Sequence, residues 1–201
     1  MSQLIFDETK GIGYMPFTSP PIYDDAYFEK YVPMGESTFG VALNALRAGL
    51  VLRYVPRGNE LLDVGIGDGA FIRARGAWTL GYDVNPKAKR MLERRDAWCD
   101  PLGAGKSVWN ATFWDSLEHM ENPETLINMV KDHCFVSIPV FLDKDHILRS
   151  KHFRPNEHYW YFTRAGIIKW FWDLGFDCLE MNDMETKLGR EDIGTFVFKR
   201  Q

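Results

Sequence analysis

The sequence predicts an α/β protein with a doubly wound sheet of seven strands, mostly parallel, and an antiparallel strand at the C-terminal end. Two observations predict this fold class. Short apolar runs of strand length alternate with stretches of helical periodicity from residue 37 onward. The first run, Leu61–Val64, also passes directly into three glycines at alternate positions, Gly65, Gly67 and Gly69, before a helical segment begins at Ala70.

The remaining elements follow from caps and stop signals. Ser37, Asn85 and Thr163 are expected to cap helices, Asn122-Pro123 to start one, and Gly175 to end the last. Helices are expected at 24–31, 37–55, 86–94 and 164–174, and strands at 61–64, 77–83, 97–100, 107–114, 134–141, 176–181 and 195–199. We expect Pro139 to end the fifth strand and residues 143–158 to form a loop.

Length and composition set the class of protein. The chain has 201 residues, of which 45% are hydrophobic and 26% charged, as in an ordinary globular protein, so we expect one domain over 1–201. The net charge of −4 does not favour sequence-independent binding of nucleic acid. Three cysteines far apart in the sequence indicate reduced thiols, and there is no membrane-spanning or signal-like run; we expect a cytoplasmic protein. The oligomeric state stays open.

Residues 1–36 are rich in aromatics and prolines, too rich for a disordered tail. They are expected to form a loop and a short helix that act as a strap over the sheet or as a lid over a ligand, with the core at 37–201. Within them, Thr18-Ser19-Pro20-Pro21 resembles the Ser-Pro-Pro-aromatic motif of DNA amino methyltransferases. Ile22 is not aromatic and the strand order is not permuted, so a kinked surface loop is favoured.

The loop after the first strand indicates the class of ligand. Its spacing is G-x-G-x-G rather than the G-x-G-x-x-G of dinucleotide sites, and Asp63 and Asp68 flank it. Two carboxylates would repel a diphosphate at close range, whereas they suit a ligand with a sulfonium and an ammonium group. The loop therefore favours S-adenosylmethionine over NAD, with contacts at Asp63, Gly65, Gly67 and Gly69.

Asp83 supports this assignment. It ends the next apolar run, 20 residues after Asp63, where a carboxylate accepts hydrogen bonds from both ribose hydroxyls of a nucleoside ligand. Asn85-Pro86 then caps a helix and fixes where the strand stops.

These residues resemble the class I S-adenosylmethionine-dependent methyltransferases, Rossmann-like enzymes, in the group with a Leu-Glu-His motif after the fourth strand. The pieces that match cover roughly residues 55–200: 62–69, 81–86, Asp115-Ser116-Leu117-Glu118-His119, and the tail from Phe162-Thr163 to Gly175-Phe176. The resemblance implies further cofactor contacts at Ile66, Val84, Asp100, Asp115 and Ser116. For Asp100, a solvated turn before Pro101 is an equal alternative.

Methyl transfer needs the acceptor aligned and sometimes deprotonated. His119 is the best candidate base because imidazole titrates near neutrality; a histidine that caps or packs the helix is an equal alternative. The resemblance places His158 and Tyr159 on the substrate side, while Trp160 and Phe162 are expected in the core. Some quinone-type O-methyltransferases with this motif are thought to hold a divalent metal through the Glu-His pair. Glu118, His119 and Glu121 would be the donors here, but adjacent residues on one turn face different ways, so no metal ligand is assigned.

The sequence thus predicts an S-adenosylmethionine-dependent methyltransferase that acts on oxygen or nitrogen of a small molecule, with His119 and His158 as catalytic residues. The alternatives are a methyltransferase for nucleic acid or protein, a non-catalytic S-adenosylmethionine-binding protein, and a nicotinamide-dependent dehydrogenase.

Overall fold

The computed structural model describes residues 3–16, 22–76 and 78–201, and the chain divides into two compact units. The glycine-loop unit comprises Ile22–Trp114 and Met129–Phe135. The hairpin unit comprises Asp115–Asn128, Val136–Gln201 and the N-terminal residues up to Pro21. Whether the chain is one domain stays a prediction.

The sheet of the glycine-loop unit is parallel. Strand β3 (Leu61–Val64) pairs with β4 (Thr79–Tyr82) on one side and with β5 (Val108–Trp114) on the other. The first half of β6 (Val130–Phe141) also belongs to this unit. The strand expected at 97–100 is reduced to one parallel bridge between Gly81 and Trp98. All four β3 residues are buried, which explains their apolar run.

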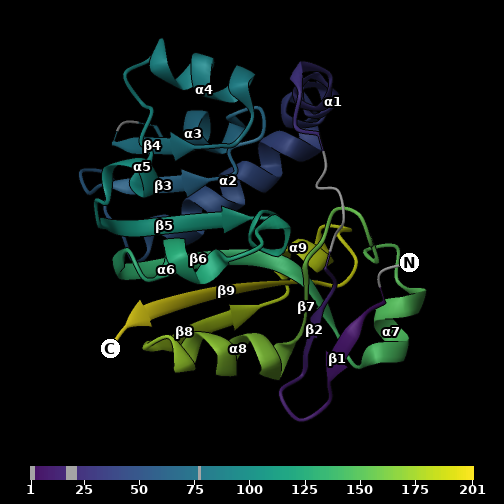
Figure 1. Cartoon of the computed structure of the whole chain (residues 1–201). Helices are drawn as coiled ribbons and strands as arrows, with labels where there is room; N and C mark the ends of the chain where they lie inside the picture. The colour runs from purple at the N-terminus through teal and green to yellow at the C-terminus, as the bar shows by residue number, and fades with distance from the viewer. Residues whose placement is uncertain (1–2, 17–21, 77) are drawn as a thin grey trace. The chain divides into compact units, whose positions relative to one another are not determined.

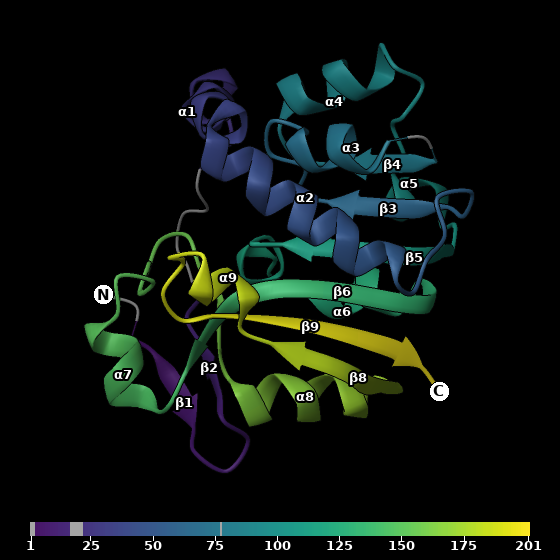
Figure 2. The same ribbon diagram turned by 180° about the vertical axis from the view of Figure 1, so that it is seen from behind.

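Five helices of this unit are described: α1 (Asp25–Glu36), α2 (Thr38–Leu52), α3 (Ala70–Arg75), α4 (Pro86–Glu93) and α5 (Pro101–Ala104). The predicted caps hold, since Ser37 accepts a hydrogen bond from the Gly40 N–H and Asn85 accepts from Lys87 and Ala88. Helix α2 covers one face of β3 and β5; it lies behind them in Figure 1 and in front of them in Figure 2.

The hairpin unit contains the antiparallel strands. β1 (Ile5–Asp7) pairs with β2 (Ile12–Tyr14), and β2 pairs antiparallel with β7 (Trp160–Thr163), which runs parallel to the end of β6. β8 (Phe176–Asn182) is antiparallel to β9 (Ile193–Arg200), and β9 pairs with β6. The helices are the 3₁₀ turn η1 (Leu117–His119), α6 (Pro123–Ile127), α7 (Lys144–Arg149), α8 (Arg164–Asp173) and α9 (Met184–Lys187).

The predicted fold class is confirmed: the sheet is mostly parallel and doubly wound, with antiparallel strands at its C-terminal end. The described residues form nine strands rather than seven, because β1, β2 and β7 were not expected and the strand expected at 97–100 is only a bridge. Strands of three residues carry too little alternation to be recognised. In the part of the chain that is described, no helix is long and apolar enough to cross a membrane; the cytoplasmic location stays a prediction.

Local predictions fail in three further places. β6 continues through Pro139 to Phe141, since Val140 still donates to the Asp192 carbonyl (2.8 Å) and pairs with β7. The loop expected at 143–158 contains α7, which Asp143 caps through the His146 N–H. Asn122 precedes α6 without a side-chain cap. The Thr18–Pro21 motif lies outside the described residues.

Gly81 of β4 tests how tightly the glycine loop is packed on the sheet. A Cβ at this position would lie 2.8–2.9 Å from side-chain atoms of Leu92, Ile66 and Ile72. We therefore expect Gly81→Ala to lower the free energy of unfolding by about 1–3 kcal/mol through overpacking, measured by denaturant titration. The control Gly49→Ala adds a methyl group in open space on α2 and should raise stability by about 0.5–1 kcal/mol. Equal effects of the two substitutions would contradict this packing.

Candidate cofactor and catalytic site

The glycine loop is built from left-handed backbone. Gly65, Gly67 and Gly69 have φ angles of 78°, 55° and 77°, which side chains with a Cβ rarely adopt. Gly65 donates its N–H to the Tyr82 carbonyl (2.8 Å), and Gly69 donates to the Ile66 carbonyl (2.9 Å). The spacing of the glycines is thus explained by the turn itself, which joins the end of β3 to α3.

Asp83 lies beside this turn. Its Oδ2 accepts the Gly67 N–H (3.3 Å) and its Oδ1 accepts the Asn85 N–H (2.8 Å). Burial raises the pKa of the Asp83 carboxyl above its ordinary value, although these backbone hydrogen bonds act in the opposite direction. The structure therefore brings together Asp83 and the glycine loop, as the sequence predicts.

Asp63 is not a fully ionised carboxylate near neutral pH, and this weakens the electrostatic part of the prediction. Its side chain is buried and its Oδ1 accepts the Thr112 hydroxyl hydrogen (2.7 Å). Burial raises the pKa of Asp63 to about 7. The other expected charge, Asp68, forms an ion pair with Arg73 (2.8 Å). Two uncompensated carboxylates at the loop are therefore not present, and the preference for a cationic ligand cannot rest on them.

Helix α1 packs against the glycine loop and α4. Phe28 is in one apolar cluster with Ile66, Ala88 and Leu92. At the end of α1, a Cβ on Gly35 would lie 2.2 Å from Oδ2 of Asp68. Residues 25–36 thus pack at the predicted cofactor loop. Whether residues 1–36 act as a strap or as a lid stays a prediction.

The remaining predicted contacts of this unit differ in exposure. The Ile66 side chain is buried in the cluster with Phe28, so that only its backbone lies in the loop. Val84, next to Asp83, is 64% exposed and available to a ligand. Asp100 caps α5 through the Gly103 N–H (2.9 Å), which fits the solvated-turn alternative but leaves its second oxygen for a ligand.

Asp115 and Ser116 follow β5 and belong to the hairpin unit. Asp115 has a φ of 53°, unusual for a residue with a side chain, and its carboxylate accepts a hydrogen bond from Arg190 (2.8 Å). Ser116 is buried and precedes η1.

The side chains of His119 and His158 are in contact. Neither their spacing in the sequence nor their neighbouring residues predict this contact. Their rings pack edge to face with centroids 4.6 Å apart. The reason is a backbone hydrogen bond from the Tyr159 N–H to the Glu118 carbonyl (2.8 Å), which joins η1 to the segment before β7.

The cluster of Glu118, His119 and His158 is uncharged. Burial lowers the pKa of His119, lowers that of His158 to about 2, and raises that of Glu118 to about 8. Among the residues that the structure describes, Glu118 Oε2, His119 Nδ1 and the Tyr161 hydroxyl are buried without a hydrogen-bond partner. Sequence reasoning missed Tyr161; its alternation with Trp160 and Phe162 in β7 signals only a strand.

The side chains of Glu118, His119 and His158 each offer one ligand atom. These atoms all lie within 4.8 Å of one another, so the three residues can hold a metal ion. The third donor is His158 rather than Glu121, which is exposed. A carboxylate and two imidazoles are donors that suit Zn²⁺ better than Mg²⁺.

Comparison with known proteins agrees with this geometry. Residues 42–181 match the family described as "Methyltransferase domain". No curated protein matches the sequence significantly.

Several solved structures share the fold at low sequence identity. A magnesium protoporphyrin IX methyltransferase from Synechocystis PCC 6803 with bound S-adenosylhomocysteine superposes with a TM-score of 0.67 at 14% identity, over 89% of this chain and 96% of that one. The 1,6-didemethyltoxoflavin-N1-methyltransferase of Burkholderia thailandensis superposes with a TM-score of 0.59 at 13% identity, over 100% of this chain and 99% of that one. The [4+2]-cyclase SpnF superposes with a TM-score of 0.59 at 16% identity, over 83% of each chain.

The buried Asp63 predicts a pH-dependent stability. Its pKa of about 7 lies above the ordinary 3.8, so between these values the folded protein keeps a proton that the unfolded chain releases. Asp63 therefore lowers stability as the pH rises through this window, by up to about 1.4 kcal/mol per pH unit. Asp63→Asn should flatten the unfolding free energy between pH 4.5 and 7, since the amide can still accept from Thr112.

The measurement is urea denaturation at several pH values in that window. The control is Asp96→Asn, which removes an exposed carboxylate. The backbone of Asp96 is left-handed, and asparagine tolerates this conformation. An unchanged slope in Asp63→Asn would show that Asp63 is ionised in the folded protein.

Proposed function

Because the chain belongs to the methyltransferase-domain family, we propose that it transfers the methyl group of S-adenosylmethionine to an oxygen or nitrogen atom of a small molecule. Asp83 beside the glycine loop is the observation that carries the proposal. Its two oxygens accept backbone hydrogen bonds and have lone pairs left for the two hydroxyls of a ribose.

The proposed cofactor contacts are the loop glycines, the Ile66 backbone and Asp83 for the nucleoside, with Val84 and Asp100 toward the adenine. Asp63 acts behind the loop, where its hydrogen bond to Thr112 links the ends of β3 and β5. Asp115 and Ser116 are proposed as further contacts, because they follow β5 directly along the chain.

A small acceptor is supported by two lines. Two of the structures with this fold are methyltransferases of magnesium protoporphyrin IX and of 1,6-didemethyltoxoflavin, both small molecules. The net charge of −4 argues against a polyanionic acceptor. The SpnF cyclase supports a second candidate, a reaction other than methyl transfer on the same fold.

His119 and His158 are proposed to promote removal of the acceptor's proton. Both rings lie at one place in the hairpin unit, and burial keeps both uncharged, so that each presents a nitrogen lone pair. The methyl transfer itself is an in-line displacement from the sulfonium, for which alignment of the acceptor is the main requirement.

Asp83→Ala should weaken the binding of S-adenosylhomocysteine by about 1–3 kcal/mol, through loss of charge-assisted hydrogen bonds. Isothermal titration calorimetry measures this directly, and NAD should not bind to the unmodified protein. The control Glu93→Gln removes an exposed carboxylate on α4. Binding of NAD in place of the homocysteine compound would refute the assignment of the cofactor.

His119→Gln and His158→Gln should retain affinity for S-adenosylhomocysteine while methyl transfer falls by about 10²–10⁴-fold, the usual contribution of a positioned base. The assay follows labelled methyl groups into a panel of phenols, hydroxy acids and amines. The control is Glu121→Gln, an exposed residue on the same segment. If no member of the panel accepts a methyl group while the cofactor binds, the non-catalytic or cyclase alternative replaces the proposal; full activity in both variants removes the histidines from it.

A further inference from the structure

Arg190, between α9 and β9, joins two carboxylates that lie far apart in the sequence. Its Nη2 donates to Asp115 Oδ1 (2.8 Å), and its Nη1 donates to Glu185 Oε2. Glu185 is completely buried, while the side chains of Arg190 and Asp115 are 22% and 31% exposed. The planar fork of a guanidinium can hold two carboxylates in fixed directions, which a lysine ammonium cannot.

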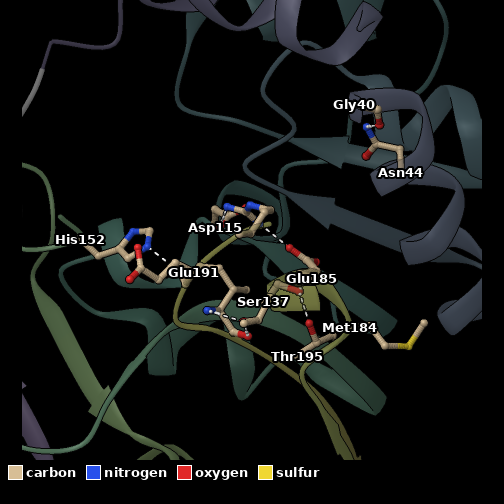
Figure 3. A network of polar contacts seen from close by, with 12 residues as sticks. Gly40, Asn44, Asp115, Ser137, His152, Met184, Glu185, Glu191 and Thr195 are labelled. Atoms are coloured by element: carbon tan, nitrogen blue, oxygen red, sulfur yellow. Dashed lines mark hydrogen bonds and ion pairs between the residues drawn. The ribbon is translucent and has the colours of Figure 1, made fainter. Parts of the chain in front are cut away.

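The Glu185 carboxylate is itself fixed to the sheet. Its Oε1 accepts the Ser137 hydroxyl hydrogen (2.7 Å), and Ser137 Oγ lies 3.1 Å from Thr195 Oγ1 on β9. Figure 3 shows Asp115, Ser137, Glu185 and Thr195 grouped around this point. The arginine is therefore anchored to β6 and β9 through a buried partner.

Asp115 is held at two points by the same network. Its N–H donates to the Ser137 carbonyl (2.9 Å), and its carboxylate accepts from Arg190. The left-handed backbone of Asp115 (φ 53°) is unfavourable for a residue with a Cβ and persists where contacts impose it. Residues 116–119, including the buried Glu118 and the ring of His119, follow this held residue directly.

We propose that Arg190 is a positioning residue, which holds Asp115 in its left-handed conformation and thereby presents residues 115–119 in the single arrangement that the reaction uses. Arg190 acts through Asp115. The inference rests on the proposed function for the role of these residues, but the ordering of the segment can be measured without any reaction.

Arg190→Lys separates positioning from charge. A lysine keeps a positive charge near the buried Glu185, so the melting temperature should stay close to that of the unmodified protein. It cannot hold both carboxylates, so amide hydrogen exchange in peptides covering 115–120 should become faster, while the rest of the hairpin unit keeps its protection.

The affinity for S-adenosylhomocysteine should fall in the same variant. If the segment is in the binding-competent conformation for about a tenth to a third of the time, the dissociation constant rises about three- to tenfold. The matched control is Lys187→Met, which removes an exposed cation of α9 that pairs with Asp183. It should change neither the exchange nor the affinity.

An Arg190→Lys protein with unchanged exchange at 115–120 and unchanged affinity would overturn the proposal, and so would a lower melting temperature with neither local effect. Should this variant fail to fold, Asp115→Asn weakens the same contact from the other side, because the amide oxygen carries no charge while asparagine still tolerates the left-handed backbone. Faster exchange at 116–120 is expected again. If the unmodified protein binds no S-adenosylhomocysteine, the proposed function fails, whereas the hydrogen exchange still decides whether Arg190 orders the segment.

Discussion

The hydrogen bonds of the Asp83 carboxylate connect the parts of the glycine-loop unit on which its proposed role depends. One oxygen holds the loop at Gly67 and the other holds the Asn85 N–H. The Asn85 side chain then caps α4 and donates to the Asp24 carbonyl (2.7 Å), at the start of α1. The ends of two strands and the beginnings of two helices thus meet at one carboxylate. This arrangement also explains why the loop needs left-handed glycines: the turn has to bring its N–H groups toward Asp83.

Burial, rather than residue type, decides which acidic groups of this protein carry charge. Asp63 lies within β3, whereas Asp83 follows the neighbouring parallel strand β4. Asp63 has one hydroxyl partner, and its pKa of about 7 leaves it largely uncharged in mildly acidic solution. Burial raises the pKa of Asp83 as well, but Asp83 accepts several backbone N–H groups that favour its ionised form. The identity of the ligand is therefore better argued from the hydrogen bonds of Asp83 than from the number of acids near the loop.

The sequence predicts the parts of this structure that local rules control. The glycine turn, the Asn85 and Thr163 caps and the strands β3 and β4 follow from backbone preferences of a few residues. The pairing of β2 with β7 joins residues 146–150 positions apart along the chain, and the meeting of His119 with His158 joins residues 39 positions apart. No local pattern encodes either contact. The same holds for Asp115, whose conformation is imposed by an arginine 75 residues later.

The carboxyl groups of the hairpin unit are of two kinds: some pair with an arginine, and one is protonated. This difference has a chemical consequence. Glu185 and Asp115 share Arg190, whose pKa they raise, so both carboxylates of this group are held by one guanidinium. Glu118 has an oxygen without a hydrogen-bond partner in the described structure and a pKa of about 8, so it stays protonated beside two neutral imidazoles. The uncharged cluster by itself does not repel a sulfonium or attract an anion. The neutral imidazole of His119 keeps a lone pair and is proposed to accept the proton, whereas His158, whose pKa is about 2, accepts a hydrogen bond rather than a proton. The charged network thus holds the segment, while the residues proposed for catalysis stay neutral.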